Sequence, residues 1–179
     1  MSEPRRLNLG CGTALRSGYV NLDVLELPGV DVVHDLRVLP WPFEDDSFEE
    51  VFAFHVLEHL PDTVKVMEEI WRILAPDGIL DAEVPHARSV GFLSDPTHAA
   101  RFTEKTFNYF TEESPERPES SYNFYSHARF EIVSLERLSV RYPRFLGSKK
   151  LFKWFVDARL EIDAGAVSVK LRKAARCQS

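Results

Sequence analysis

Cysteine is scarce in this sequence, and other common features are missing altogether. Only two cysteines occur, Cys11 and Cys177, near opposite ends of the 179 residues. So few cysteines exclude a disulfide-stapled secreted domain and predict free thiols in a reducing compartment, for which we expect the cytoplasm. No apolar run is long enough to span a bilayer, and the first residues lack the apolar core of a secretory signal, so we expect neither a membrane span nor a leader.

An excess of positive charge is also missing. Lys and Arg number 22 against 28 Asp and Glu, a formal net charge of -6, which argues against nucleic-acid binding. The charge is uneven, because residues 1–133 hold 11 basic and 24 acidic side chains whereas residues 134–179 hold 11 basic and 4 acidic ones. This basic part is either a chance imbalance or a surface for an anionic substrate, a lipid surface or an acidic partner, so peripheral membrane contact stays open.

Short runs rich in Val, Phe and Ile predict a mostly parallel sheet. They are too short for helices and suit strands that are buried on both faces. Two longer stretches near the end predict closing strands. The five short runs are residues 5–10, 19–24, 30–34, 50–55 and 78–85, and the two longer stretches are residues 129–141 and 159–172.

Apolar residues spaced three and four apart predict one clear helix, with Asp62 or Thr63 as its cap and a stop at 75–78. Residues 50–85 therefore predict a strand, helix, strand crossover. We expect further helices around 104–110 and over 148–158. The segment 86–127 is rich in His, Pro, Ser and aromatic residues, with its loop at 115–121, and predicts an irregular insert that covers a substrate. The chain as a whole, 1–179, predicts one domain.

A glycine pair follows the first predicted strand, in the order Gly10, Cys11, Gly12. Glycine lets backbone N–H groups approach a polar ligand closely, although a tight structural turn would use the same residues. The third glycine of the dinucleotide fingerprint is missing, because Leu15 stands in its place. Nicotinamide and flavin binding are therefore disfavoured.

Two aspartates stand at or just past the ends of the second and third predicted strands. Asp23 is placed to accept hydrogen bonds from both hydroxyls of a ribose, and Asp35 from an adenine amino group. Either could instead cap a turn. Because ligands of open α/β sheets bind at the carboxyl ends of the strands, the two aspartates and the glycine pair together predict a nucleoside pocket.

Residues 7–24 resemble the cofactor loop and second strand of class I S-adenosylmethionine-dependent methyltransferases. Residues 39–60 and 69–80 resemble the fourth strand, helix and fifth strand of the small-molecule, type 11-like branch, and residues 95–110 resemble an insert of one subset. The resemblance implies a Rossmann-like α/β fold, with a mostly parallel seven-stranded sheet and a terminal antiparallel strand. Since only residues 13–18 separate Gly12 from the second strand, the family's first helix must be reduced.

The resemblance also implies a cofactor, S-adenosylmethionine, and a set of contacts to it. Its methionine part would lie against the glycine loop, its ribose against Asp23, its adenine against Asp35 and Leu36, and its sulfonium end beside His55. The residues implied at the glycine loop are Asn8, where the family usually has an acid, followed by Gly10, Cys11 and Gly12.

The predicted reaction is methyl transfer to an oxygen or nitrogen of a small molecule. Such an acceptor must lose a proton, and histidine is suited to take it near neutral pH. The candidates, in order of preference, are His98, His86 and His55. Asp95 could orient His98, and Arg101 could bind a carboxylate or phosphate of the substrate or pair with Glu104 on the surface.

Two other function classes fit parts of the sequence. The absent acid and reduced helix also fit a non-catalytic S-adenosylmethionine-binding module. Residues 55–59 spell the H-x-x-E-H pattern of a metal hydrolase, but Pro61 argues against the continuous helix that this pattern requires. Glu58 and His59 also fit part of a magnesium site, although His55 replaces its first acid. On balance the sequence predicts no resident metal.

Overall fold

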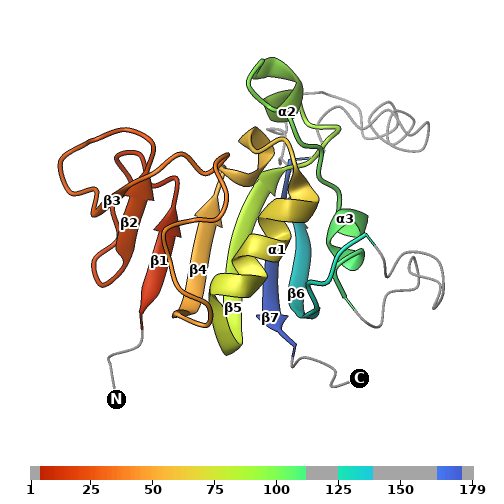
Figure 1. Ribbon diagram of the computed structural model, residues 1–179. Coiled ribbons are helices and arrows are strands. Elements are labelled where there is room, and N and C mark those ends of the chain that lie inside the picture. The colour runs from red at the N-terminus through yellow and green to blue at the C-terminus, as the bar shows by residue number, and fades with distance from the viewer. Residues whose placement is uncertain (1–4, 112–124, 139–164, 175–179) are drawn as a thin grey trace, which may run out of the picture.

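A computed structural model describes residues 5–111, 125–138 and 165–174 of the chain. Its strands form one seven-stranded sheet in the order β3-β2-β1-β4-β5-β7-β6 (Figure 1). The first five strands along the chain pair in parallel, and β7 pairs antiparallel to both β5 and β6. The strands are β1 (Arg6–Leu9), β2 (Val20–Asp23), β3 (Val32–Val33), β4 (Phe48–Phe54), β5 (Leu74–Pro85), β6 (Phe130–Leu138) and β7 (Ala166–Lys173). The predicted Rossmann-like sheet with its antiparallel strand is confirmed.

Helices are few in the described part of the chain. They are α1 (Thr63–Ile73), α2 (Val90–Ser94), α3 (Glu104–Asn108) and a 3-10 turn, η1 (Leu57–His59). Residues 10–19, which connect β1 to β2, form turns only, so the predicted reduction of the first helix is confirmed. None of the described helices is long and apolar enough to cross a membrane. The predicted helix 148–158, the loop 115–121 and the start of the predicted last strand lie outside the described residues.

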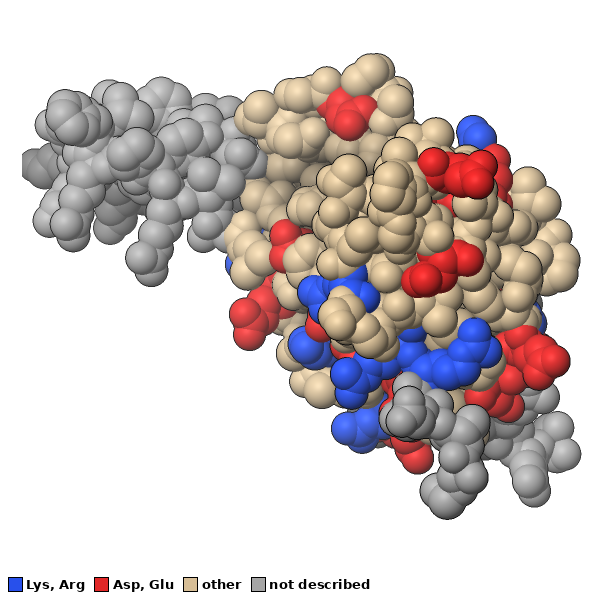
Figure 2. All heavy atoms as spheres, turned by 90° about the vertical axis from the view of Figure 1, so that its left-hand side faces the viewer, with Lys and Arg blue, Asp and Glu red and all other residues tan. Residues whose placement is uncertain are grey.

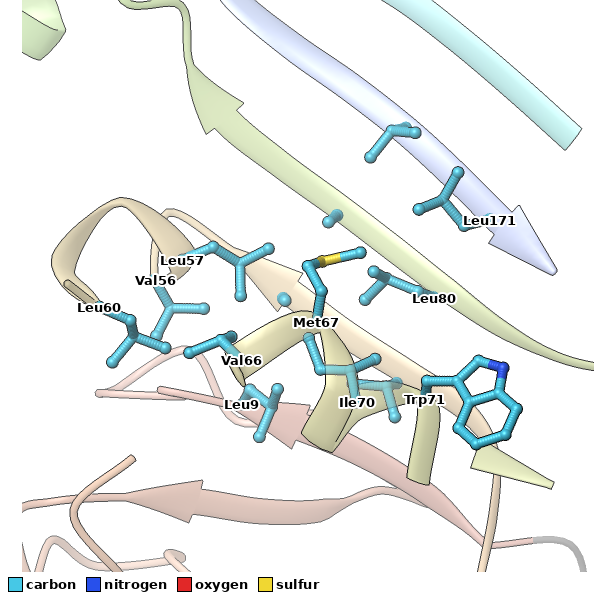
Figure 3. Close-up of a cluster of buried hydrophobic side chains, with 14 of the residues drawn as sticks. Leu9, Val56, Leu57, Leu60, Val66, Met67, Ile70, Trp71, Leu80 and Leu171 are labelled. Carbon is cyan, nitrogen blue, oxygen red and sulfur yellow. The ribbon is translucent and has the colours of Figure 1, made fainter. Parts of the chain in front are cut away.

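Helix α1 covers one face of the sheet with its apolar side (Figure 3). Asp62 caps its start, because its Oδ1 accepts the Lys65 backbone N–H at 3.1 Å. Met67 and Ile70 are fully buried and lie above the strands, close to Leu80 of β5. The helix ends at Ile73 and the chain enters β5 at once, so the crossover predicted from residues 50–85 is confirmed.

The opposite face of the sheet is charged. Along β7, Val167, Val169 and Leu171 are fully buried, while the residues that alternate with them, among them Lys170 and Arg172, pair with acids on neighbouring strands. The pairs on this face are Arg6–Glu50 (3.5 Å), Lys170–Asp81 (2.8 Å) and Arg172–Glu131 (3.3 Å). Cross-strand ion pairs take the place of apolar packing on this face of β7, whereas on β4 the buried Phe52, the register partner of Asp81, lies on the same face. The expectation of strands buried on both faces therefore holds only in part.

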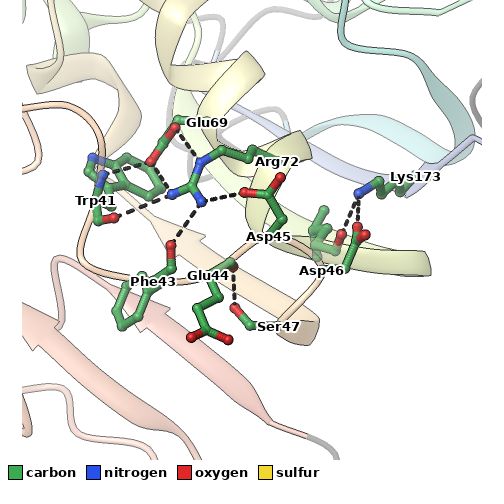
Figure 4. Close-up of polar contacts among 10 residues, drawn as sticks. Trp41, Phe43, Glu44, Asp45, Asp46, Ser47, Glu69, Arg72 and Lys173 are labelled. Carbon is green, nitrogen blue, oxygen red and sulfur yellow. Dashed lines mark hydrogen bonds and ion pairs between the residues drawn. The ribbon is translucent and has the colours of Figure 1, made fainter.

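A buried ion pair ties α1 to the loop before β4 (Figure 4). The Glu69 carboxylate accepts the Trp41 backbone N–H at 2.6 Å and the Arg72 guanidinium at 2.6 and 2.9 Å. Arg72 also donates to the Phe43 carbonyl and to Asp45, both at 2.8 Å. These acceptors, Glu69 first, raise the pKa of Arg72 above its ordinary value. One guanidinium therefore holds a helix and a loop together.

We expect Arg72→Ala to lower the free energy of unfolding by about 2–4 kcal/mol, because it leaves the carboxylate of Glu69 buried with only one donor. Urea unfolding followed by circular dichroism measures this change. The matched control is Lys65→Ala, which removes an exposed ion pair with Asp62 on the same helix and should cost less than about 0.5 kcal/mol. Equal losses in the two variants would contradict the role given to Arg72.

Candidate functional site

A cavity of about 380 Å³ opens at the carboxyl ends of the parallel strands. Gly10 follows β1, Asp23 ends β2, Asp35 follows β3 and His55 follows β4, and all four line the cavity. The volume lies in the range of small-molecule sites, and the place is where open α/β sheets bind ligands. The full lining is Gly10, Asp23, Val24, His34, Asp35, Leu36, Arg37, His55, Val56, His59, Leu60 and Thr97.

The turn after β1 can be built only with glycine at its first position. Gly10 has φ +58°, and a Cβ there would lie 2.4 Å from the Cγ2 of Val56. Two residues later, the Gly12 N–H donates to the Oδ2 of Asp23 at 2.7 Å, and the Leu25 N–H donates to its Oδ1 at 3.0 Å. Each oxygen of the buried Asp23 carboxylate keeps a further lone pair for a ligand hydroxyl.

Asn8 and Cys11, two of the predicted cofactor contacts, lie behind this turn and are buried. The Asn8 side chain donates to the Asn21 Oδ1 at 2.9 Å and to the Ala14 carbonyl at 3.0 Å, which uses both of its N–H groups. The Cys11 N–H donates to the Leu22 carbonyl, and burial raises the pKa of the Cys11 thiol. Both residues therefore brace the loop, and neither lines the cavity.

The predicted adenine contacts, Asp35 and Leu36, both line the cavity. Asp35 is held by the Arg37 guanidinium, with Nη2 to Oδ2 at 2.7 Å and Nε to Oδ1 at 2.9 Å. These bonds hold the pKa of Asp35 at about 2. The Leu36 side chain is buried, and its carbonyl accepts the Trp41 indole N–H at 3.0 Å, which fixes this wall of the cavity.

His55 is the predicted catalytic histidine that lines the cavity. It follows β4 directly, has φ +51° and is about half exposed. Its Nδ1 lies 3.4 Å from the Glu58 Oε1 and its Nε2 lies 3.3 Å from the Glu83 Oε1. The hydrogen bond to Glu58 raises the pKa of His55 above the ordinary histidine value.

His98 and His86, the two histidines ranked above His55, lie outside this lining. The His98 ring stacks on Phe92, and its Nε2 lies 3.6 Å from the Oδ2 of Asp95, so the predicted neighbourhood of Asp95 and His98 is present. His86 is buried, and its Nε2 lies 3.4 Å from the Oε2 of Glu104. The sequence made all three histidines candidates for the same catalytic role. Of the three, the structure brings His55 and His98 close to Glu58, in the turn after β4.

The insert after β5 is attached to the turn after β4. The Ala99 and Ala100 N–H groups both donate to the Glu58 carbonyl, at 2.8 and 2.9 Å, and Thr97 of the same segment lines the cavity. Figure 1 shows α2, near the start of this insert, beyond the carboxyl ends of the strands. The position fits the predicted covering role for the described part of 86–127. Arg101, predicted to bind substrate, is exposed.

The H-x-x-E-H pattern of residues 55–59 does not form the helix that a hydrolase of that type needs. Within these described residues, only Leu57–His59 is helical, as a single 3-10 turn, and His55 directly follows β4 with a left-handed backbone. Pro61, two residues after this turn, explains the absence of a longer helix here, because proline does not fit the interior of a continuous helix.

The charges around the cavity favour a neutral or cationic ligand. Asp23 and Asp35 line it together with one arginine, Arg37, which is already paired with Asp35. Figure 2, which views the molecule from the β3 side, shows most Lys and Arg side chains of that face gathered in its lower half. The carboxyl ends of the parallel strands point upward in the same orientation. The basic part of this face therefore lies away from the ends where the cavity opens.

Sequence reasoning missed the cavity residues His34, Arg37, His59 and Thr97 as ligand contacts. A signal for His34 and Arg37 was available, since they flank Asp35 and Leu36. Thr97 had no such signal, because its approach to His59 depends on how the insert folds back over 38 residues.

Comparisons of sequence connect this chain to methyltransferases. Residues 26–81 match the family described as "Methyltransferase domain". A demethylmenaquinone methyltransferase of Bacillus mycoides is 29% identical over 79 residues, which are 44% of this chain and 33% of that enzyme. The chain thus spans about a third of the length of this curated relative.

Solved structures share the fold over almost the whole chain. An S-adenosylmethionine-dependent methyltransferase from Archaeoglobus fulgidus has a TM-score of 0.63 at 16% identity, covering 95% of this chain and 86% of its own. The [4+2]-cyclase SpnF has a TM-score of 0.61 at 19% identity, covering 96% of this chain and 75% of its own. At 16% and 19% identity, this similarity shows a shared fold and nothing further.

We expect Gly10→Ala to destabilise the protein by about 2–4 kcal/mol, because the new methyl group meets Val56 and the backbone is left-handed. Gly12→Ala is the matched comparison, since its φ is +49° but its Cβ would meet nothing within 4 Å, and should cost about 1 kcal/mol. Thermal unfolding of both variants measures the difference. If Gly12→Ala were the more damaging change, the account of this turn would be wrong.

Proposed function

We propose that this chain is a class I S-adenosylmethionine-dependent methyltransferase of the type 11 branch and that it transfers a methyl group to an oxygen or nitrogen of a small molecule. One observation carries the proposal. Gly10, Asp23 and the Asp35–Leu36 pair, which lie at three separate strand ends, line a single cavity of the right size for a nucleoside and an amino-acid tail.

The described residues fit an adenosine at the β2–β3 side of the cavity. Asp23 has lone pairs left on both carboxylate oxygens for two ribose hydroxyls. Leu36 supplies an apolar wall for the adenine ring. Asp35 would accept from the adenine amino group by sharing its carboxylate with Arg37, which already donates to both oxygens. Gly10 carries no side chain and lines the same cavity, so its backbone could lie against the rest of the ligand.

The β4 end of the cavity fits the reacting end of the cofactor. When bound, S-adenosylmethionine supplies a methyl group on a positively charged sulfur. The carboxylates of Glu58 and Glu83, on either side of His55, lie where positive charge would be stabilised. His59 and Thr97 form the neighbouring wall, on the side of the insert. Because a methyl transfer needs an aligned acceptor more than it needs charge stabilisation, this wall would act by positioning the acceptor and excluding water.

A non-catalytic binding module is the second candidate, and two observations favour it. Asn8, in place of the usual acid, is committed to bracing the loop, and no helix follows β1 in residues 10–19 to direct its N-terminus at the ligand. The two candidates share the cavity and differ only in turnover. An assay for the transfer of a labelled methyl group distinguishes them.

We expect Asp23→Asn to weaken the binding of S-adenosylhomocysteine at least about tenfold, because the amide has one acceptor oxygen where the carboxylate has two. Isothermal titration calorimetry measures the dissociation constant. Asp77→Asn is the matched control, since Asp77 is exposed at the start of β5 and its left-handed backbone suits asparagine. The absence of binding by the unaltered chain at high ligand concentration would remove the proposed function.

We expect radiolabel from the methyl group of S-adenosylmethionine to appear in a fraction of small molecules extracted from cells. The same extract incubated with Asp23→Asn should give at least about tenfold less product at a limiting cofactor concentration. Chromatography with scintillation counting detects the product. Tight binding of S-adenosylhomocysteine with no labelled product in any extract would favour the binding module.

A further inference from the structure

Three metal-ligating side chains meet beside the proposed acceptor wall. One ligand atom each from Glu58, His59 and His98 lies within 4.8 Å of the others. Glu58 and His59 belong to η1, whereas His98 belongs to the insert 39 residues further along the chain. The two Ala99 and Ala100 hydrogen bonds to the Glu58 carbonyl fix the segments against each other. The cluster is therefore built by the fold rather than by chance contact of mobile side chains.

The Glu58 carboxylate is buried without enough partners. Its side chain is 1% exposed, and its Oε2 has no hydrogen-bond partner among the described residues. Its Oε1 lies 3.4 Å from the His55 Nδ1 and 4.0 Å from the His98 Nε2, so both of these contacts are made by Oε1 and neither by Oε2. A buried oxygen of this kind is costly when it is left unsatisfied, and a bound cation would satisfy it.

Hydrogen bonds orient both histidine rings with a lone pair available. The His98 Nδ1 lies 3.0 Å from the Phe92 carbonyl, which can only accept, so Nδ1 carries the proton and Nε2 has the lone pair. The Thr97 hydroxyl donates to Asp95 at 2.6 Å, so it must accept from the His59 Nδ1 at 2.9 Å, which frees the His59 Nε2. Such bonds to carbonyls and hydroxyls are typical of histidines that bind metals.

The His98 Nε2 faces two carboxylates. It lies 3.6 Å from the Asp95 Oδ2 and 4.0 Å from the Glu58 Oε1. Three electron-rich atoms in this arrangement repel one another unless a proton or a cation lies among them. A proton on Nε2 would leave the Glu58 Oε2 unsatisfied. A metal ion held by Glu58, His59 and His98 would place a positive charge among these atoms and give the Glu58 carboxylate a partner. Ligand atoms around a tetrahedral ion lie about 3.3 Å apart, so the cluster would contract around the ion.

We propose that Glu58, His59 and His98 bind one divalent first-row transition-metal ion, with a coordination position open to the cavity. Two imidazoles and one carboxylate suit zinc, cobalt, manganese or iron, whereas magnesium and calcium prefer oxygen ligands. The cavity side follows from His59, which lines both the cluster and the cavity. The sequence predicted no resident metal and a general base at His98. This proposal instead makes His98 a ligand of a metal ion.

The role of the ion, unlike its binding, rests on the proposed function. A Lewis acid at this wall would polarise an acceptor hydroxyl and lower its pKa, so the inference narrows the acceptor to an alcohol or phenol. The O–H bond breaks, its proton passes to solvent and its electron pair stays on the oxygen. That oxygen forms the new C–O bond as the C–S bond of the donor breaks with its electrons on sulfur. No oxidant or reductant is consumed.

The test uses untagged full-length protein treated with EDTA and dialysed. Titration with Co²⁺ should give one equivalent with visible absorption bands of low-symmetry coordination, and Zn²⁺ should displace it. We expect His98→Ala and Glu58→Gln to weaken binding more than about a hundredfold, and Thr97→Val, which removes the partner of the His59 ring, about 10–100-fold. His127→Ala is the matched control, because His127 is an exposed histidine paired with Glu68 away from the cluster, and should bind as tightly as the unaltered chain.

Several outcomes would overturn the inference. The proposal would be wrong if neither ion bound at micromolar concentration, or if more than one equivalent bound weakly. It would also be wrong if His127→Ala lost as much affinity for the ion as His98→Ala. Thermal unfolding of each variant without metal shows whether it is folded. Calorimetry with S-adenosylhomocysteine on the metal-free chain keeps the two proposals apart, because cofactor binding without metal binding would remove only the metal site, and the reverse would remove only the methyl transfer.

Discussion

The hydrogen bond from the Gly12 N–H to the Asp23 carboxylate is the interaction on which the cavity depends. Residues 10–19 contain no helix, so nothing periodic holds the chain between β1 and β2 in place. Side chains of the strands do so instead, with Asp23 in front and the Asn8–Asn21 pair behind. The same carboxylate would meet the ribose of a bound cofactor, so the shape of the loop and the affinity for the ligand depend on one group. This explains how a short loop without a helix can keep an open cavity.

Glu58 has a comparable double role at the other end of the cavity. Its backbone carbonyl holds the insert through Ala99 and Ala100, and its buried side chain faces His55 and His98. The described part of the insert is therefore attached at the residue whose buried carboxylate faces His55 and His98. Because the insert docks on the turn after β4, its residue Thr97 reaches the wall of the cavity.

Much of the fold could be predicted because its signals are local. Each short apolar run became a strand, the spacing of Val64, Met67 and Ile70 marked α1, and Asp23 and Asp35 stood at strand ends as expected. What failed depends on pairing between distant residues. Sequence spacing does not show that Lys170 meets Asp81, that Asn8 is used up by Asn21, or that His98 returns to Glu58. Sequence spacing also does not show that His55 lines the cavity and His86 does not, since both follow strands and only three-dimensional packing places one of them there.

The position of β7 between β5 and β6 has a consequence for how the protein is made. On the ribosome, β6 emerges before β7, its strand neighbour among the described residues, and β5 presents an unpaired edge until residues 166–173 follow. Such an edge is a template for association with other chains during synthesis. Completion of the sheet, and with it the burial of Leu171 beside Leu80, must therefore wait until residues 166–173 have left the exit tunnel, so nascent chains stalled before β7 expose this edge to association.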